Sequence, residues 1–160
     1  WPRESGSSIK CTLRGVKFMT KTLVDTNILV YSVQADEGGK HDAASKAISE
    51  LMDRGEMAVS VQNLVEFSRI LLEKASPNVD HETVKQYVFG FMKFSAVISY
   101  SSQSVSSAIS LSRQHKIHFF DALLAATMEE NRITKILTED VQDFSKVPWL
   151  EVKSPFKQKG

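Results

Sequence analysis

The sequence predicts a single α/β domain in which helices cover both faces of a mostly parallel sheet. Short apolar segments alternate with longer segments whose apolar residues recur at helical spacing, and this alternation is typical of βαβ units. The 160 residues are 42% hydrophobic, which is enough for one core without a disulfide or a structural metal. Neither a repeat nor a linker divides the chain, so one domain is expected.

Five short segments rich in apolar and β-branched residues are the predicted strands. In chain order they are 23–24, 57–61, 96–100, 134–138 and 150–152. The first segment is too short to be half-exposed, which suits the centre of a parallel sheet. The last segment is expected at an edge.

The remaining periodic segments are predicted to be helices from their apolar spacing and their capping residues. In chain order they are 28–33, 43–54, 63–74, 81–94, 102–114 and 119–131. Gly55 stands where the C-terminal cap of the second helix belongs. Residues 34–40, which include two glycines, are expected to form a loop.

Four segments each carry an acidic residue beside core-like residues. Asp25 and Asp140 come just after predicted strands, and the functional crevice of a parallel sheet lies beyond the carboxyl ends of its strands. Glu66 lies at the border of the apolar face of its helix, and Asp121 shares a helix face with apolar residues. The fold is therefore expected to gather these carboxylates into one pocket.

Each acid also has a purely structural interpretation. Asp25, Thr26 or Asn27 could cap the helix that begins near residue 28, and Asp121 could likewise cap the helix that begins at residue 122. Glu66 could pair with Arg69 or another surface cation, and Asp140 and Asp143 could be ordinary turn residues. Taken together these interpretations weaken, because burying unpaired charges at the border of a core is costly.

A cluster of carboxylates implies a particular chemistry. Acids packed within a few ångströms repel one another unless divalent cations neutralise them. A site made only of oxygen ligands suits Mg²⁺ or Mn²⁺, as one or two ions. Such a site can activate a water and offset charge on the leaving oxygen of a phosphodiester. Metal-dependent hydrolysis of a phosphodiester is therefore the predicted reaction.

Four stretches around these acids occur in a characteristic order. They are 23–30 (Leu-Val-Asp-Thr-Asn-Ile-Leu-Val), 60–67 (Ser-Val-Gln-Asn-Leu-Val-Glu-Phe), 119–126 (Phe-Phe-Asp-Ala-Leu-Leu-Ala-Ala) and 136–144 (Ile-Leu-Thr-Glu-Asp-Val-Gln-Asp-Phe). In order and spacing they resemble the PIN-domain nucleases, and in particular the VapC-like toxins of toxin–antitoxin pairs. The resemblance covers residues 19 to about 156. It implies a three-layer α/β/α domain with a five-stranded sheet.

The resemblance also implies a function and a set of site residues. The implied activity is that of a Mg²⁺- or Mn²⁺-dependent endoribonuclease, which forms a homodimer and is inhibited by a small antitoxin protein. By position, the catalytic and metal-binding acids are Asp25, Glu66, Asp121 and Asp140, with Asp143 as a further metal ligand. By the same resemblance, Thr26, Asn27 and Thr138 correspond to the family's residues that orient carboxylates or water through hydrogen bonds. Glu139 or Asp143 could replace Asp140 as the fourth acid.

The ends of the chain and its charge set further expectations. Residues 1–18 carry a net charge of +3, which leaves −2 for residues 19–160, and they are predicted to be a disordered extension that precedes a native start at Met19. Residues 157–160 are expected to be frayed. The body is not strongly basic, so metal ions and a local basic patch must attract nucleic acid. The candidate phosphate contacts are Arg113, Lys116, Lys153, Lys157 and Lys159.

Cysteine content and hydropathy favour the cytoplasm. The single cysteine, Cys11, has no partner, which suits a reducing compartment. No apolar run approaches the roughly 20 residues of a membrane span, and so no membrane association is expected.

Other interpretations of the same residues predict different functions. His115, His118 and Asp121 are spaced by three and would form a facial metal site on a continuous helix, although the segment between the histidines looks like a helix break. An aspartyl phosphatase would use Asp25 as its nucleophile, but it needs a second Asp where this chain has Asn27. The non-enzymatic alternative is a catalytically inactive module that binds RNA or protein.

Overall fold

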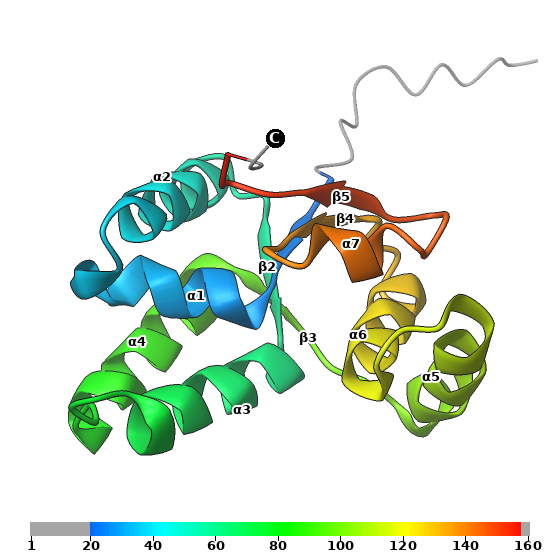
Figure 1. The fold of residues 1–160 in the computed structure, drawn as a ribbon, viewed down its shortest axis with the longest axis horizontal. Coiled ribbons are helices and arrows are strands. Elements are labelled where there is room, and N and C mark those ends of the chain that lie inside the picture. The colour runs from blue at the N-terminus through cyan, green and yellow to red at the C-terminus, as the bar shows by residue number, and fades with distance from the viewer. Residues whose placement is uncertain (1–19, 158–160) are drawn as a thin grey trace, which may run out of the picture.

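A five-stranded sheet runs through the middle of the molecule, and all of its neighbouring strands are parallel (Figure 1). The computed structural model describes residues 20–157. Its strands are β1 (Thr22–Val24), β2 (Met57–Ser60), β3 (Ala96–Ile98), β4 (Lys135–Leu137) and β5 (Glu151–Lys153). The predicted α/β class and the parallel sheet are confirmed. The extension predicted over 1–18, the start at Met19 and residues 158–160 lie outside the described residues.

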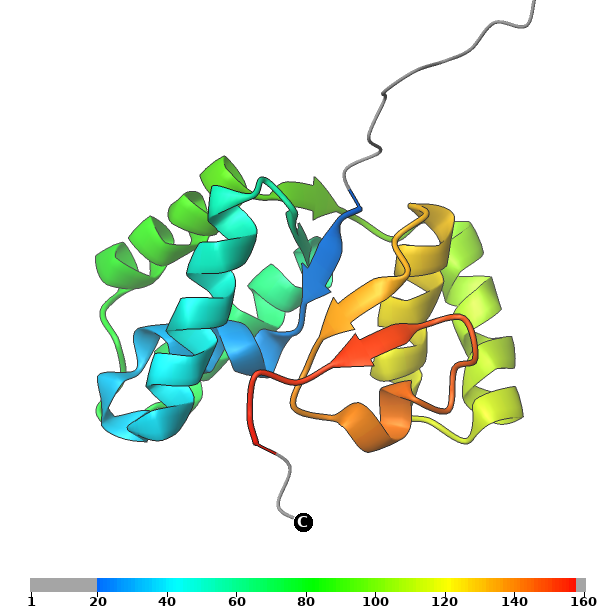
Figure 2. The same ribbon diagram turned by 90° about the horizontal axis from the view of Figure 1, so that it is seen from above.

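Helices cover both faces of this sheet. They are α1 (Thr26–Val33), α2 (Gly39–Asp53), α3 (Val61–Arg69), α4 (His81–Phe94), α5 (Ser102–His115), α6 (Phe119–Glu130) and α7 (Val141–Phe144). A 3₁₀ turn (Ala35–Glu37) precedes α2, and a π-helical turn (Ile70–Lys74) extends α3. Helices α1–α4 lie on one side of the sheet and α5–α7 on the other (Figures 1 and 2).

Alternate residues of the buried strands supply two separate apolar layers. Val24 and Val59 pack with the helices of the α1–α4 side, whereas Leu23 and Ala58 pack with α6 and α7 on the other side. Both faces of the central strands are therefore buried. For this reason their sequences are short continuous apolar segments and do not alternate between apolar and polar residues. This arrangement confirms the three-layer α/β/α architecture.

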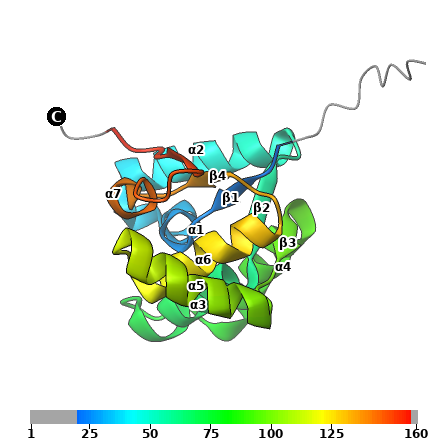
Figure 3. The ribbon, with the colours of Figure 1, turned by 90° about the vertical axis from the view of Figure 1, so that its right-hand side faces the viewer.

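Helix α5 is attached to the sheet through α6. Figure 3 shows α5 lying over α6, and Ala108 of α5 packs with Ala122 and Ala126 of α6 in a third apolar cluster. The small side chains of α6 allow this close approach on one face of the helix. Its other face, which includes Leu124 and Met128, is buried against the sheet.

The boundaries at α2 differ from the predicted ones. This helix begins at Gly39, four residues earlier than expected, and the predicted loop holds the 3₁₀ turn. Gly38 makes this possible because it adopts a φ of 54° between the two elements. At the other end the predicted cap is confirmed. Gly55, with φ of 63°, donates its N–H to the carbonyl of Met52, and Glu56 donates to the carbonyl of Leu51.

Two further boundaries were misplaced. Strand β2 ends at Ser60, and α3 begins directly at Val61, because the Ser60 hydroxyl accepts the N–H of Asn63 and caps the helix. The residues after β4 form the short helix α7, where only a turn was expected. Both elements lie at the carboxyl edge of the sheet, so these differences bear directly on the site.

The strand order is β3-β2-β1-β4-β5, so the chain builds outward from β1 first in one direction and then in the other. The connections after β1 and β4 therefore diverge, and a crevice is expected between their carboxyl ends. Here the N–H of Asp25 donates to the carbonyl of Leu137 at 3.0 Å, which joins the two strand ends. No helix within residues 20–157 is long and apolar enough to cross a membrane.

Replacing Phe67 with alanine tests the packing of the α1–α4 layer. This side chain is fully buried and makes edge-on contacts with Phe91 and Tyr87 at centroid distances of 5.3 and 6.4 Å. Phe67→Ala is expected to lower the free energy of unfolding by about 4 kcal/mol and Tm by roughly 10 °C. In the control, Phe89→Ala, the removed ring is 67% exposed, so the change should stay within about 0.5 kcal/mol. Equal losses in the two variants would contradict this packing.

Candidate metal centre

Asp25 lies at the carboxyl end of β1 and both of its carboxylate oxygens are hydrogen-bonded. As the N-cap of α1, it accepts the N–H of Thr26 on Oδ1 at 2.7 Å, and its Oδ2 accepts the hydroxyl of Thr138 at 2.7 Å. Burial raises the pKa of Asp25, and the charges of Glu66 and Asp140 raise it further, although the two hydrogen bonds oppose the shift. The capping interpretation is thus correct, yet it does not account for the other carboxylates nearby.

Thr138 connects Asp25 to the turn that carries the later acids. Its side chain is fully buried at the end of β4, where it donates to Asp25 and accepts the N–H of Asp140 at 3.0 Å. One hydroxyl therefore fixes both the orientation of the Asp25 carboxylate and the path of the backbone into α7. The role predicted for Thr138, which is to orient a carboxylate or a water, stays a prediction.

Glu66 reaches the site from α3 through a chain of buried polar side chains. Its Oε2 accepts the hydroxyl of Thr26 at 2.9 Å, and Thr26 in turn accepts the side-chain amide of Asn63 at 3.1 Å. Its Oε1 accepts the amide of Gln62 at 3.2 Å. Arg69 makes no ion pair within residues 20–157, so the suggested Glu66–Arg69 pair is wrong.

Gln62 and Asn63 were not singled out from the sequence. Asn63 is fully buried, and its carbonyl oxygen also accepts the hydroxyl of Ser60 at 2.7 Å. The Gln62 amide also donates to the backbone carbonyl of Phe120 at 3.0 Å, which ties α3 to α6. The available signal was the spacing Ser60-x-x-Asn63, which is typical of a capping box, but it does not reveal a contact with Thr26.

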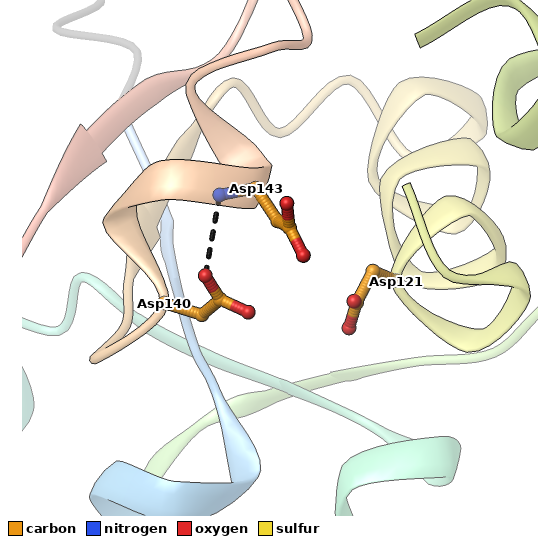
Figure 4. Close-up of side chains that lie close together, drawn as sticks. All are labelled: Asp121, Asp140 and Asp143. Carbon is orange, nitrogen blue, oxygen red and sulfur yellow. Dashed lines mark hydrogen bonds between the residues drawn. The ribbon is translucent and has the colours of Figure 1, made fainter. Parts of the chain in front are cut away.

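Three aspartates face one another across the gap between α6 and α7 (Figure 4). Asp121, Asp140 and Asp143 each offer a carboxylate oxygen, and these oxygens all lie within 4.8 Å of one another. Asp140 is the N-cap of α7, since its Oδ1 accepts the N–H of Asp143 at 3.2 Å. Asp143 also forms an ion pair with Lys146 one turn along the chain.

Asp121 projects from the first turn of α6 and is electrostatically coupled to the other acids. The N-cap of α6 is His118, so the interpretation of Asp121 as the cap is wrong. Burial, followed by the charges of Asp25, Asp140 and Asp143, raises the pKa of Asp121 to about 6, while His118 opposes the shift. Asp25 therefore interacts with Glu66 on one side and with Asp121 and Asp140 on the other.

Other predicted side chains lie elsewhere. Glu139, the neighbour of Asp140, accepts hydrogen bonds from Tyr31 and Lys40 and is not a member of the aspartate cluster. Asn27 is exposed on the first turn of α1 and makes no side-chain hydrogen bond within residues 20–157. Of the two residues that could have replaced Asp140, therefore, only Asp143 faces the other aspartates.

The continuous helix needed for a histidine-containing facial site is absent from the described part of the chain. Helix α5 ends at His115, and Lys116 has a left-handed φ of 55°. His118 begins the next helix as its N-cap. The break predicted between the two histidines is confirmed, and the facial arrangement is wrong.

The donor set fits a hard divalent cation. The five acids offer only oxygen ligands. Burial and then mutual repulsion raise the pKa of Asp25 and Asp121, and a cation between the carboxylates would relieve the repulsion. Asp121, Asp140 and Asp143 bring carboxylate oxygens within 4.8 Å of one another. Asp25 is coupled through its charge to Asp121, Asp140 and Glu66.

Comparisons with known proteins agree with this architecture. The family model of the PIN domain matches residues 22–150. No curated protein sequence matches the chain. Among solved structures, the chain is similar to that of VapBC2 from Rickettsia felis bound to a DNA fragment of the VapBC2 promoter. The TM-score is 0.64 and the identity 19%, over 84% of this chain and 98% of that one.

Two further solved structures share the fold. VapC20 from Mycobacterium tuberculosis, a sarcin-ricin loop cleaving toxin, matches with a TM-score of 0.64 and 16% identity over 78% of this chain and 94% of that one. FitAcB from Neisseria gonorrhoeae matches with a TM-score of 0.61 and 18% identity over 84% and 97%. At identities of 16–19%, this structural similarity establishes the fold of the chain.

The raised pKa of Asp121 predicts that its charge destabilises the metal-free protein. Between the ordinary value of 3.8 and about 6, the unfolded chain releases the proton while the folded chain keeps it, so stability falls as the pH rises through this window. Asp121→Asn is therefore expected to stabilise the protein at pH 7 in EDTA, by about 1 kcal/mol after allowance for partial exposure of the side chain.

Thermal unfolding of the two proteins from pH 4 to pH 8 measures this effect. The gain in Tm should be roughly 3 °C at pH 7 and should vanish toward pH 4. Asp36→Asn, which removes an exposed acid outside the cluster, serves as the control and should leave the pH profile unchanged. A gain independent of pH would contradict the electrostatic origin.

Proposed function

Because the chain belongs to the PIN domain family, we propose that it is an endoribonuclease that depends on divalent metal ions. The observation that carries the proposal is the convergence of acids from four distant segments at the carboxyl ends of β1 and β4. Structural roles alone do not account for it, because like charges held together destabilise a fold that gains nothing from them. The proposed location is the cytoplasm.

The proposed metal ligands are Asp25, Glu66, Asp121 and Asp140, with Asp143 at the margin. Mg²⁺ or Mn²⁺, as one or two ions, matches such ligands because both ions prefer carboxylate oxygens and retain waters and substrate phosphate in their shell. Bound there, the ion would supply an activated water as nucleophile and would offset charge on the leaving oxygen.

The protein's own groups hold these ligands in place. Thr138 fixes one oxygen of Asp25, and Thr26 fixes one oxygen of Glu66. The side-chain amide of Asn63 donates a hydrogen bond to the Thr26 hydroxyl. The three supporting side chains, Thr26, Asn63 and Thr138, are all buried. Buried partners of this kind restrict ligand orientation, which is what a metal site requires of its surroundings. No histidine base is needed in this scheme.

We further propose that the chain is the toxin of a toxin–antitoxin pair. The structural neighbours include a toxin–antitoxin complex from Klebsiella pneumoniae. On this chain a cavity of about 350 Å³ between α1, α2 and α4 offers an apolar surface to such a partner. Its apolar lining residues are Val33, Ile48, Met52, Tyr87, Phe91 and Phe94. A small antitoxin could bury part of this surface with an apolar helix face.

A homodimer is also proposed, with a contact surface beside the acids. Val65 and Phe120 are 62% and 63% exposed and line a cavity of about 330 Å³ between α3 and α6, together with Val61 and Tyr100. A contiguous exposed apolar patch favours contact with another protein surface. Glu66 lines the same cavity, so a second copy seated there would border the catalytic cluster.

Cleavage of a mixed pool of structured and single-stranded RNA tests the nuclease proposal. The protein should cut RNA with added Mn²⁺ or Mg²⁺ and stop cutting in EDTA. Asp121→Asn should lower the rate at least about 100-fold, since loss even of a residue that supports a ligand costs 10–100-fold. Asp36→Asn, outside the cluster, should cut like the wild type. Absence of cutting by a protein whose Tm rises with Mn²⁺ would favour the alternative, a catalytically inactive module that binds RNA or protein.

Light scattering coupled to size exclusion tests the homodimer. The expected mass is twice the chain mass of 17.9 kDa. Val65→Asp should give a monomer, because it introduces a charge into the apolar patch, whereas Phe89→Asp, at an exposed residue of α4 outside this cavity, should leave the dimer intact. A monomeric wild-type protein would reject the proposed assembly.

A further inference from the structure

A second cavity, of about 470 Å³, adjoins the carboxylate cluster on the side away from α6. It lies between α2, the turn into α7 and the chain that follows β5, and we call it the Lys40 pocket. Its lining includes the lysines Lys40 and Lys157, the acids Glu139 and Asp140, and Gln142, Ser154 and Phe156. Asp140 belongs both to this lining and to the aspartate cluster, so the pocket borders the proposed active site.

Hydrogen bonds to Glu139 and Tyr31 hold the half-exposed Lys40 side chain at the wall of the pocket. Its ammonium donates to Glu139 at 2.5 Å and to the Tyr31 hydroxyl at 3.1 Å, and that hydroxyl donates to Glu139 at 2.7 Å. These hydrogen bonds raise the pKa of Lys40 above its ordinary value, at which the ammonium is already charged at neutral pH. An ammonium has three donors, and two are used here, which leaves one for a ligand.

Phe156 supplies a fixed aromatic ring. Its ring meets that of Tyr31 edge-on, with centroids 5.5 Å apart and an interplanar angle of 81°. The Lys40 ammonium lies 5.6 Å from the Phe156 centroid. The ring is therefore ordered by its neighbours before any ligand arrives, and aromatic side chains of this kind provide stacking surfaces for nucleic-acid bases.

Polar groups complete the lining. Lys157 is exposed and makes no ion pair within residues 20–157. The Ser154 hydroxyl accepts the N–H of Phe156 at 3.2 Å and keeps its own proton free to donate. The Gln142 amide offers both a donor and an acceptor. Two ammonium groups, a flat ring and an amide match the phosphate and the base of one nucleotide.

We propose that the Lys40 pocket binds the nucleotide of the RNA strand next to the scissile phosphate. Lys40 and Lys157 contact its phosphate, and Phe156 stacks on its base. The inference rests on the proposed nuclease function and adds to it the place where the strand is held. The volume of the Lys40 pocket lies within the range of about 300–1,000 Å³ typical of ligand sites.

The charge of the surroundings explains why such a pocket would be required. The acids repel phosphate, and residues 19–160 carry a net charge of −2. Affinity for RNA then depends on a few cations close to the site, each of which contributes to the salt dependence of binding. Lys40 and Lys157 are cations that line a cavity bordered by Asp140 of the cluster.

Binding of a short single-stranded RNA that contains 2-aminopurine tests the proposal. The assay uses the full chain with Ca²⁺, and a gel verifies that the RNA remains uncut. Phe156→Leu keeps an apolar side chain but removes the stacking surface, and it should weaken binding about 10-fold and abolish the quenching of 2-aminopurine. Lys157→Gln should weaken binding several-fold and reduce the slope of log K against log salt by about 0.7.

The matched control is Lys85→Gln, which removes an exposed lysine of α4 that does not line the pocket. It should bind like the wild type. If the wild type binds RNA and both pocket variants bind equally well with unchanged Tm, the pocket assignment is overturned while the nuclease proposal stands. If the wild type neither binds nor cuts RNA, the nuclease proposal fails and the pocket assignment fails with it.

Discussion

Repulsion between carboxylates at the carboxyl ends of β1 and β4 is the constraint that the surrounding structure has to satisfy. The fold holds Asp25 and Glu66 with hydrogen bonds from buried hydroxyls and amides, and Asp143 pairs with Lys146. Thr138 holds Asp25, and Thr26 with Asn63 behind it holds Glu66. The pKa values of Asp25 and Asp121 remain raised despite this support. The favourable energy that maintains the arrangement therefore comes from the apolar layers on either side of the sheet.

Each side of the sheet contributes one part of the site. The α1–α4 side supplies Glu66 and its supporting amides, and the α5–α7 side supplies Asp121 and Asp143. Asp25 lies between them at the end of the central strand. The amide of Gln62 also reaches across from α3 to α6. The geometry of the cluster therefore depends on how the two helical layers pack on the same three-residue strand.

Sequence patterns predicted the elements and the acids but not the contacts that orient them. Asp25 and Asp140 were predictable because an acid just after a buried strand lies at the carboxyl edge of a parallel sheet. The role of Asn63 was not predictable, because a polar residue directly before an apolar stretch is typical of any helix start. Glu139 and Asp143 were equally plausible substitutes for Asp140, since only the short helix α7 decides which of them faces Asp121. The start of α2 was missed because two adjacent glycines are typical of a loop, whereas here Gly38 supplies a positive φ before the helix and Gly39 is already its first residue.

The hydrogen bond between Thr138 and Asp25 joins residues 113 positions apart in the chain. Contacts of such long range form late, because the intervening loop has to be closed before they stabilise the fold. During synthesis, the first half of the sheet and Glu66 emerge well before β4 and the last aspartates. An incomplete chain thus lacks the assembled carboxylate cluster, and whatever chemistry the cluster performs begins only when the whole domain has folded. The order of the strands along the chain therefore delays assembly of the carboxylate cluster until the last strands have folded.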